Sequence, residues 1–142
     1  MKRLKIFAVI LLIGIISSGF LYTIWPNDGN CENITLTGYV HEQPTGKPAV
    51  NCSIAVFNCI NHDDKVFSES KLFTTTDSGG YYEIEIEKSC QMYIRAYKEG
   101  YVIGRSGIVR AAPETEYNFM LTKGFSKKKY FLKQQEVSEI IQ

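Results

Sequence analysis

Two histidines and two acidic turns are the first candidates for chemistry in this chain. His41 and His62 are its only histidines, and the segment 61–64 (NHDD) offers carboxylates that could ligate a cation. A calcium site normally gathers six or more oxygen ligands. The segment 77–79 (DSG) resembles a fragment of a calcium loop but is not followed by a bidentate glutamate at the required spacing. We therefore expect both segments to be turns and predict no metal site and no cofactor.

Catalytic motifs are also missing from the sequence. No serine or cysteine occupies a Gly-x-Ser-x-Gly nucleophile elbow, and no His-Glu-x-x-His zinc motif occurs. A catalytic site would need His41 or His62 to meet a polar cluster through long-range contacts. The sequence therefore predicts no catalytic residue and a domain that is not an enzyme.

The four cysteines, Cys31, Cys52, Cys59 and Cys90, contain no Cys-x-x-Cys pair. In an exported segment this pattern favours two disulfides over a metal site. A hairpin of the first two strands would place Cys31 and Cys59 at corresponding ends, while Cys52 and Cys90 each begin an inward-facing row. This arrangement favours pairing Cys31 with Cys59 and Cys52 with Cys90. If the second and fifth strands are antiparallel neighbours, Cys59 with Cys90 is favoured instead.

Three tyrosines are the best candidates for a binding surface. Tyr81, Tyr93 and Tyr97 fall on outward parities of neighbouring predicted strands, and exposed tyrosines can stack on sugars or anchor a protein partner. Tyrosine also commonly covers an exposed sheet face. Both interpretations stay open at this point.

Period-two alternation of apolar residues predicts the strands that position these side chains. The clearest example is 81–87 (YYEIEIE), in which Tyr82, Ile84 and Ile86 alternate with polar or tyrosine side chains. Clusters of turn residues separate the rows. The sequence predicts an all-β, antiparallel sandwich of about seven strands, whose rows lie near 34–40, 52–56, 66–76, 82–86, 90–96, 106–111 and 117–121.

The turn and core residues also carry a family resemblance between about residues 34 and 121. At these positions the chain resembles the carboxypeptidase regulatory-like domain, a transthyretin-like (prealbumin-like) β-sandwich. The residues concerned are Gly38-x-Val40, 46–50 (GKPAV), the row ending in Ile54 and Val56, 76–82 (TDSGGYY), and 94–96 (IRA) before Gly100-Tyr101.

The resemblance implies an accessory module that folds, stabilises or binds without chemistry of its own. Related sandwiches bind starch, so the resemblance also implies a surface glycan-binding module as an alternative. A transthyretin-related hydrolase is the weaker alternative. The chain departs from the family pattern at Asn51, where glycine is usual, and at Cys52 and Cys90, where small or apolar residues are more common; these departures suggest an added cystine.

The N-terminal segment predicts export. Residues 6–25 carry no charge and follow Lys2, Arg3 and Lys5, which is typical of a signal anchor with its N-terminus in the cytoplasm. The alternative is a cleaved signal peptide with 6–16 as its apolar region, which would release a secreted domain. We predict a single-pass membrane protein with its C-terminal domain outside the cytoplasm.

The charges divide the chain into three parts, 1–26, 27–122 and 123–142. The first carries +3, the second has 8 basic and 13 acidic residues (−5), and the third has 5 lysines and 2 glutamates (+3), which sum to the overall +1. A mildly acidic domain is a poor nucleic-acid binder. The expected partner is an unknown surface protein or polysaccharide, and the basic tail is either a helix for a partner or a frayed end.

Overall fold

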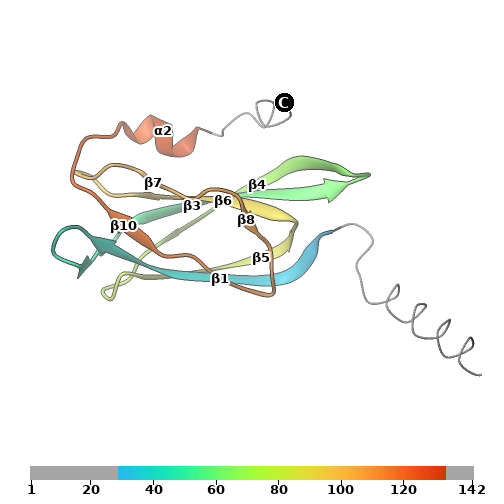
Figure 1. The fold of residues 1–142 in the computed structure, drawn as a ribbon, viewed down its shortest axis with the longest axis horizontal. Helices are drawn as coiled ribbons and strands as arrows, with labels where there is room; N and C mark the ends of the chain where they lie inside the picture. Colours follow the sequence, from blue (N-terminus) through green and yellow to red (C-terminus); the bar gives the residue numbers. More distant parts are fainter. Residues whose placement is uncertain (1–28, 134–142) are drawn as a thin grey trace, which may run out of the picture.

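Two β-sheets packed face to face form the body of the protein (Figure 1). The computed structural model describes residues 29–133, and the all-β sandwich predicted from the sequence is confirmed for this part of the chain. The predicted anchor within 1–26 lies outside the described residues. From residue 29 to residue 133, no helix is long and apolar enough to cross a membrane.

The first sheet is built around its longest strand, β1 (Cys31–Glu42). β1 pairs antiparallel with β5 (Tyr81–Ser89) and, near its end, with β2 (Lys47–Pro48). It pairs parallel with β9 (Glu114–Glu116) and β10 (Phe119–Leu121). The prediction of a purely antiparallel sandwich is wrong for these two pairs. The chain reaches β9 by crossing over from the second sheet, and a parallel pair requires a crossover connection of this kind because a short hairpin can join only antiparallel strands.

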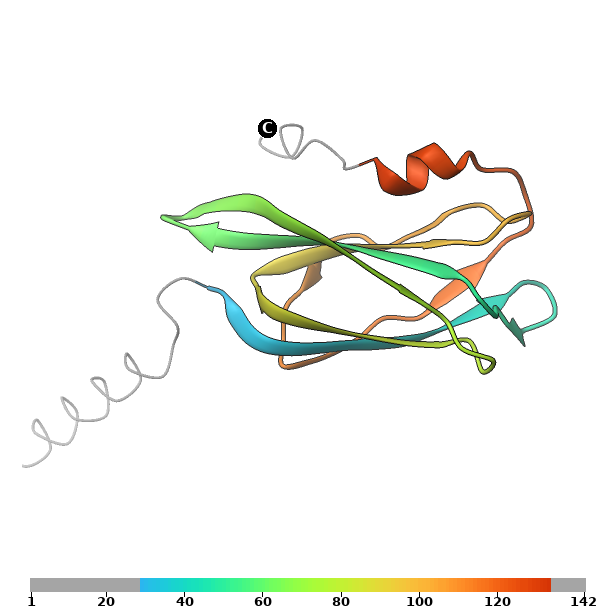
Figure 2. The same cartoon turned by 180° about the vertical axis from the view of Figure 1, so that it is seen from behind.

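The second sheet contains β3 (Ser53–His62), β4 (Lys65–Thr75) and β6 (Gln91–Tyr97), with the short strands β7 (Gly104–Arg105) and β8 (Val109–Arg110) paired to β6. β3 and β4 form a tight hairpin that projects from the end of the sandwich (Figure 2). Its turn residues Asp63 and Asp64 both have positive φ, 50° and 60°, as a two-residue hairpin turn of type I′ requires. The expected turn at 61–64 is therefore present.

The core between the sheets depends on a close approach at Gly38. The ring of Tyr82 is 1% exposed and pairs across the strands with Gly38, while its hydroxyl donates a hydrogen bond of 2.5 Å to the Tyr117 carbonyl. A Cβ at residue 38 would come within 1.9 Å of that carbonyl oxygen and 2.8 Å of the Tyr82 ring. Only glycine fits, so the ring of Tyr82 takes the place of the missing side chain.

The segment from Asp77 to Gly80 forms the predicted turn before β5. Asp77 Oδ1 accepts hydrogen bonds from the backbone N–H of Gly79 (2.8 Å) and of Tyr81 (3.0 Å). Gly80 has a φ of 74°, a conformation that glycine adopts without strain. The Asp77 carboxylate thus holds the predicted turn through these two hydrogen bonds.

The C-terminal part of the described chain packs on the second sheet instead of fraying. The helix α2 (Lys128–Leu132) buries Phe131 against Tyr97, with ring centroids 5.6 Å apart. Arg95, 5% exposed, donates from Nη1 to the carbonyl oxygens of Tyr130 (2.8 Å) and Phe131 (3.3 Å) and also to that of Lys133. Packed structure therefore continues past residue 122, where the sequence analysis ends the sandwich.

A carboxylate joins the end of β1 to the segment that follows β6. Glu42 accepts hydrogen bonds from Lys98 Nζ and from the Tyr101 hydroxyl, the latter at 2.7 Å. The hydrogen bond from Lys98, followed by that from Tyr101, lowers the pKa of Glu42 below its ordinary value of 4.5.

Replacing Gly38 should test the close approach. Gly38→Ala is expected to destabilise the domain by about 3 kcal/mol, because the new methyl group must displace backbone or the buried Tyr82 ring. The free energy of unfolding would be measured by chemical denaturation. The matched control is Gly107→Ala, since a Cβ there meets nothing within 4 Å; equal stability of the two variants would contradict the packing argument.

Removing the Glu42 charge should give a pH-dependent loss of stability. A depressed folded-state pKa means that the carboxylate stabilises the fold above its unfolded-state pKa and that this contribution is lost as the pH falls through the folded-state value. Glu42→Gln should therefore lower the melting temperature at pH 7, and the difference from the parent should shrink below pH 4.5. A difference independent of pH would show that the Glu42 charge is not involved.

Truncating the buried side chain of α2 should detach the helix. Phe131→Ala is expected to lower the free energy of unfolding by about 2 kcal/mol. This is less than for a truncation in the central core, because Phe131 belongs to the smaller apolar cluster under α2. Faster amide exchange at 128–132 would report the detachment. Leu132→Ala, at a position 45% exposed, is the control and should leave exchange unchanged.

Candidate binding face

The three tyrosines proposed as one binding surface lie on two different sheets. Tyr81 is on β5 of the first sheet, whereas Tyr93 and Tyr97 are on β6 of the second. All three point away from the central core, as their parity predicts. They do not form one surface, however, because β5 and β6 are joined directly but hydrogen-bond to different partners, β1 and β3. The prediction of a shared tyrosine platform is corrected accordingly.

Tyr93 and Tyr97 are also partly covered. They pack against a second apolar cluster made by Ala55, Phe57, Ile103 and Phe131. α2 lies over this face of the second sheet (Figure 2). Partial burial raises the pKa of Tyr93. These two tyrosines therefore serve mainly to seat the C-terminal helix.

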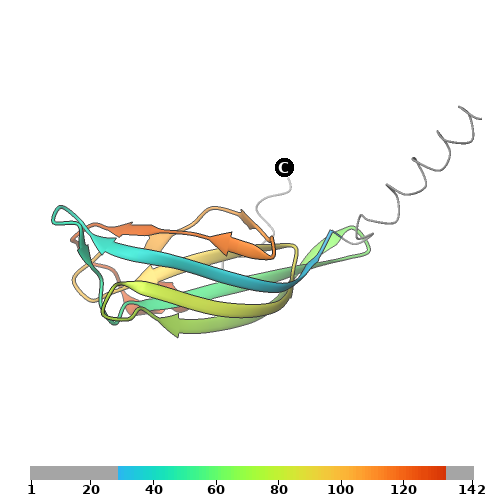
Figure 3. The same ribbon diagram turned by 90° about the horizontal axis from the view of Figure 1, so that it is seen from below.

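The outer face of the first sheet is the open one, and its central feature is a set of carboxylates. Figure 3 looks onto this sheet, with β1 between β5 and the β9–β10 segment. Thr35 of β1 is opposite Glu85 on one side and Glu114 on the other, and Thr37 is likewise flanked by Glu83 and Glu116. We call this surface the acidic face; it comprises Thr35, Thr37, Tyr39, Tyr81, Glu83, Glu85, Glu87, Glu114 and Glu116.

Two tyrosines extend the acidic face toward the end of β1. Tyr39, 45% exposed, and Tyr81 are cross-strand partners with ring centroids 5.3 Å apart. The Tyr81 hydroxyl donates to Glu83 Oε2 at 2.6 Å, and this bond to the carboxylate raises the pKa of Tyr81 to about 12. Asn118 accepts from the Tyr39 backbone N–H (2.7 Å) and donates to Glu116 (2.8 Å). The aromatic pair is thus tied to carboxylates on both sides.

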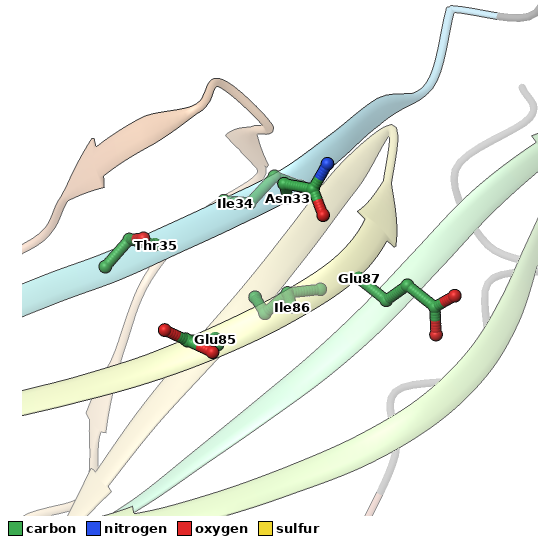
Figure 4. Close-up of a pocket in the computed structure, with 6 residues that line it drawn as sticks. All are labelled: Asn33, Ile34, Thr35, Glu85, Ile86 and Glu87. Carbon is green, nitrogen blue, oxygen red and sulfur yellow. The ribbon is translucent and has the colours of Figure 1, made fainter.

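Two hollows flank Thr35 on this face. One is lined by Asn33, Ile34, Thr35, Glu85, Ile86 and Glu87, and Figure 4 shows Thr35 on β1 beside Glu85 of the neighbouring strand. The other is lined by Thr35, Thr37, Glu114, Thr115 and Glu116. Each combines hydroxyl and carboxylate oxygens, which suit a hydrogen-bond donor or a cation as ligand.

The two histidines are not brought together. His41 lies near the end of β1, with its ring 6.2 Å from that of Tyr39, and His62 lies at the opposite end, beside Asp63 in the β3–β4 hairpin (2.9 Å). Within 29–133, no three His, Cys, Asp or Glu side chains are grouped so as to hold a metal ion.

The cysteines are divided between the two ends of the sandwich. The Cys90 N–H donates to the Cys59 carbonyl at 2.9 Å. Cys31 faces Ser89 across β1 and β5 at the same end. Cys52 lies at the other end, fully buried, where its thiol donates to the Tyr97 carbonyl (3.4 Å). The structure does not bring Cys52 to Cys90, because antiparallel β3 and β6 place them at opposite ends of the ladder.

The sequence analysis missed Tyr39, Asn118 and the glutamates of β9. The alternation of Tyr81, Glu83, Glu85 and Glu87 was visible in the sequence, and it forms one half of the acidic face. The other half depends on the parallel pairing of β9 with β1. No short-range signal announces that pairing.

No family model matches the chain. No curated protein matches it either.

Among solved structures, the chain is similar to 3-chlorocatechol 1,2-dioxygenase from Rhodococcus opacus 1CP, with 12% identity, a TM-score of 0.50, and coverage of 66% of this chain and 61% of that one. Catechol 1,2-dioxygenase from Acinetobacter sp. ADP1 has 10% identity, a TM-score of 0.49, and coverage of 69% and 54%. The dioxygenase domain of a dioxygenase carbohydrate-binding protein fusion from Streptomyces sp. SirexAA-E has 12% identity, a TM-score of 0.47, and coverage of 70% and 86%. The chain thus spans less than two thirds of the length of the first two.

The likeness to 3-chlorocatechol 1,2-dioxygenase contradicts the prediction that the domain is not an enzyme, since that similar structure is an enzyme. The prediction rested on missing local motifs, and catalytic residues can also be assembled from distant parts of a β-sandwich. At 12% identity the likeness shows the fold alone.

Proposed function

We propose that residues 29–133 form an extracytoplasmic binding or structural module, held at the membrane by the segment within 1–26, and that the acidic face is its binding surface. The resemblance to the carboxypeptidase regulatory-like domain supports a module of this kind. The partner we propose is a cationic segment of a surface protein.

The observation that carries the proposal is the double row of carboxylates along β1. Neighbouring strands are about 4.8 Å apart, so Glu85 and Glu114 lie roughly 10 Å from each other across Thr35. Both are exposed, and no ion pair joins either of them to a basic residue of the described chain. Repulsion between such carboxylates is relieved when lysine or arginine side chains bind between them.

The Tyr39–Tyr81 pair adds apolar area to this charged surface. Tyrosine is enriched at protein interfaces because its ring buries area while its hydroxyl stays hydrogen-bonded. The Tyr81 ring is held in place by its bond to Glu83. A partner therefore meets a preorganised aromatic edge next to the carboxylates, which reduces the entropy lost on binding.

The same aromatic pair favours a second candidate, a surface glycan-binding module. Sugar rings stack on exposed tyrosines, and the side chains of Glu83, Glu116 and Asn118 offer hydrogen-bond partners for hydroxyl groups. The transthyretin-related hydrolase is not proposed, because His41 and His62 lie at opposite ends of the sandwich.

Binding of a decalysine peptide to the full-length protein in nanodiscs of neutral lipid tests the proposal. We expect binding that weakens as salt increases, because exposed charges are screened. Glu85→Gln/Glu114→Gln should weaken it about 5-fold, and Tyr39→Ala/Tyr81→Ala should weaken it without changing the salt dependence.

The control is Asp64→Asn/Glu99→Gln, which removes the same number of charges at exposed sites outside the acidic face. If both charge variants lost the same amount of decalysine binding, the effect would be due to overall charge, and the assignment of binding to the acidic face would be overturned. Binding of neutral oligosaccharides that requires Tyr39 and Tyr81 but not Glu85 and Glu114 would favour the glycan-binding candidate instead.

A further inference from the structure

Cys59 of β3 and Cys90, the residue just before β6, are joined through their backbones. The N–H of Cys90 and the hydroxyl of Ser89 both donate to the carbonyl of Cys59, at 2.9 and 3.2 Å. Cys90 is next to Gln91, the cross-strand partner of Cys59, and a backbone hydrogen bond of this length brings the two Cα atoms to within roughly 7 Å of each other. A disulfide requires a Cα separation of about 4.4 to 6.8 Å, so the backbone places Cys90 within reach of a bond to Cys59.

Tyr93 is on β6, two residues from Gln91, the cross-strand partner of Cys59. Its hydroxyl is buried and has no hydrogen-bond partner within the described chain. After burial, the charges of Cys59 and Cys90 are what raise its pKa. Cys90 also raises the pKa of Cys59, after burial, and both effects agree with the backbone contact between the two cysteines.

The other two cysteines have different surroundings. Cys31 packs against the core between the sheets, whereas Tyr93 packs against the second apolar cluster on the outer side of β3 and β6. Cys52 is seven residues from Cys59 along β3, about 23 Å away in an extended strand. Neither β3 nor β6 brings another cysteine near Cys52, so a second disulfide within the chain has no geometric support.

We propose that Cys59 and Cys90 form the one dithiol–disulfide couple of the domain, with Cys31 and Cys52 remaining thiols, and that the couple exchanges with disulfides of oxidoreductase proteins or of glutathione. This replaces the expectation of two disulfides. It does not depend on the binding function proposed for the acidic face.

The difference in exposure sets the order of the exchange. Cys90 is half-buried, whereas Cys59 is 2% exposed and burial raises the pKa of its thiol to about 11. The Cys90 thiolate attacks one sulfur of the oxidant disulfide, breaks that bond and releases one thiol. Cys59 then loses its proton and attacks the Cys90 sulfur, which releases the second thiol. Two cysteine thiols give up two protons and two electrons, and one oxidant disulfide becomes two thiols.

Peptide mapping of the full-length protein in detergent tests the couple directly. The protein is equilibrated in glutathione buffers from fully reduced to fully oxidised, the remaining thiols are alkylated after denaturation, and the digest is analysed without reduction. We expect a single cross-linked peptide joining Cys59 to Cys90 in oxidising buffer, with Cys31 and Cys52 alkylated. A cross-link that includes Cys31 or Cys52, or four alkylated cysteines in every buffer, would overturn the proposal.

The change in melting temperature on oxidation gives a second test. It compares the oxidised and reduced forms of the same variant, so it can be used even where a substitution lowers stability. Cys31→Ser/Cys52→Ala should keep a melting temperature that rises by at least about 5 °C on oxidation, because the bond closes a long loop. Cys90→Ser should abolish that rise while the reduced protein melts as the parent does. A redox-dependent shift that persists in Cys90→Ser would locate the couple elsewhere.

Discussion

The approach of the Tyr82 ring to Gly38 is the constraint on which the first sheet depends. Glycine at this position lets the ring lie on the β1 backbone, and the Tyr82 hydroxyl then reaches the carbonyl of Tyr117 in the connection between β9 and β10. One side chain thus holds together β5, β1 and the segment that returns along the far edge of β1. This contact adds to the β1–β5 and β1–β9 ladders, which place the glutamates of β5 and β9 on either side of Thr35. The acidic face is therefore a consequence of packing on the inner side of the same sheet.

The short connection from β5 in the first sheet to β6 in the second decides which outer faces of the molecule are exposed. The chain leaves the first sheet at Ser89 and enters the second at Gln91, so the outward rows of these consecutive strands point to opposite sides. On the second sheet the outward row is covered, since Arg95 binds the carbonyl oxygens at the end of α2 and Phe131 fills the space beside Tyr97. On the first sheet no element of the described chain covers the outward row. For this physical reason we place the proposed binding role on the first sheet.

Local patterns in the sequence predicted the elements of the fold but not their partners. Alternation located β5 and β6, and Asp77 and Gly80 located the turn before β5, because side-chain parity and turn chemistry are decided within a few residues. The parallel pairing of β9 with β1 and the choice of sheet for β6 are decided by long-range burial. The candidate site was the hardest part to predict for this reason. Tyr81 was identified correctly as outward-facing, but its cross-strand partner Tyr39 and the glutamates of β9 come from segments that are distant in the sequence. Tyr93 and Tyr97 belong to the other sheet.

The distribution of charge follows from the same architecture. The lysines of α2 stay exposed on the second sheet while Phe131 is buried beneath them, and the glutamates gather on the first sheet, so the two outer faces differ in sign. A partner with a cationic segment is attracted to one face and repelled from the other, which orients it before contact is made. Such orientation requires only that the two faces remain rigidly opposed, and the shared apolar core between the sheets ensures that they do. In the binding role that we propose, the acidic face selects both the kind of partner and the side from which it binds.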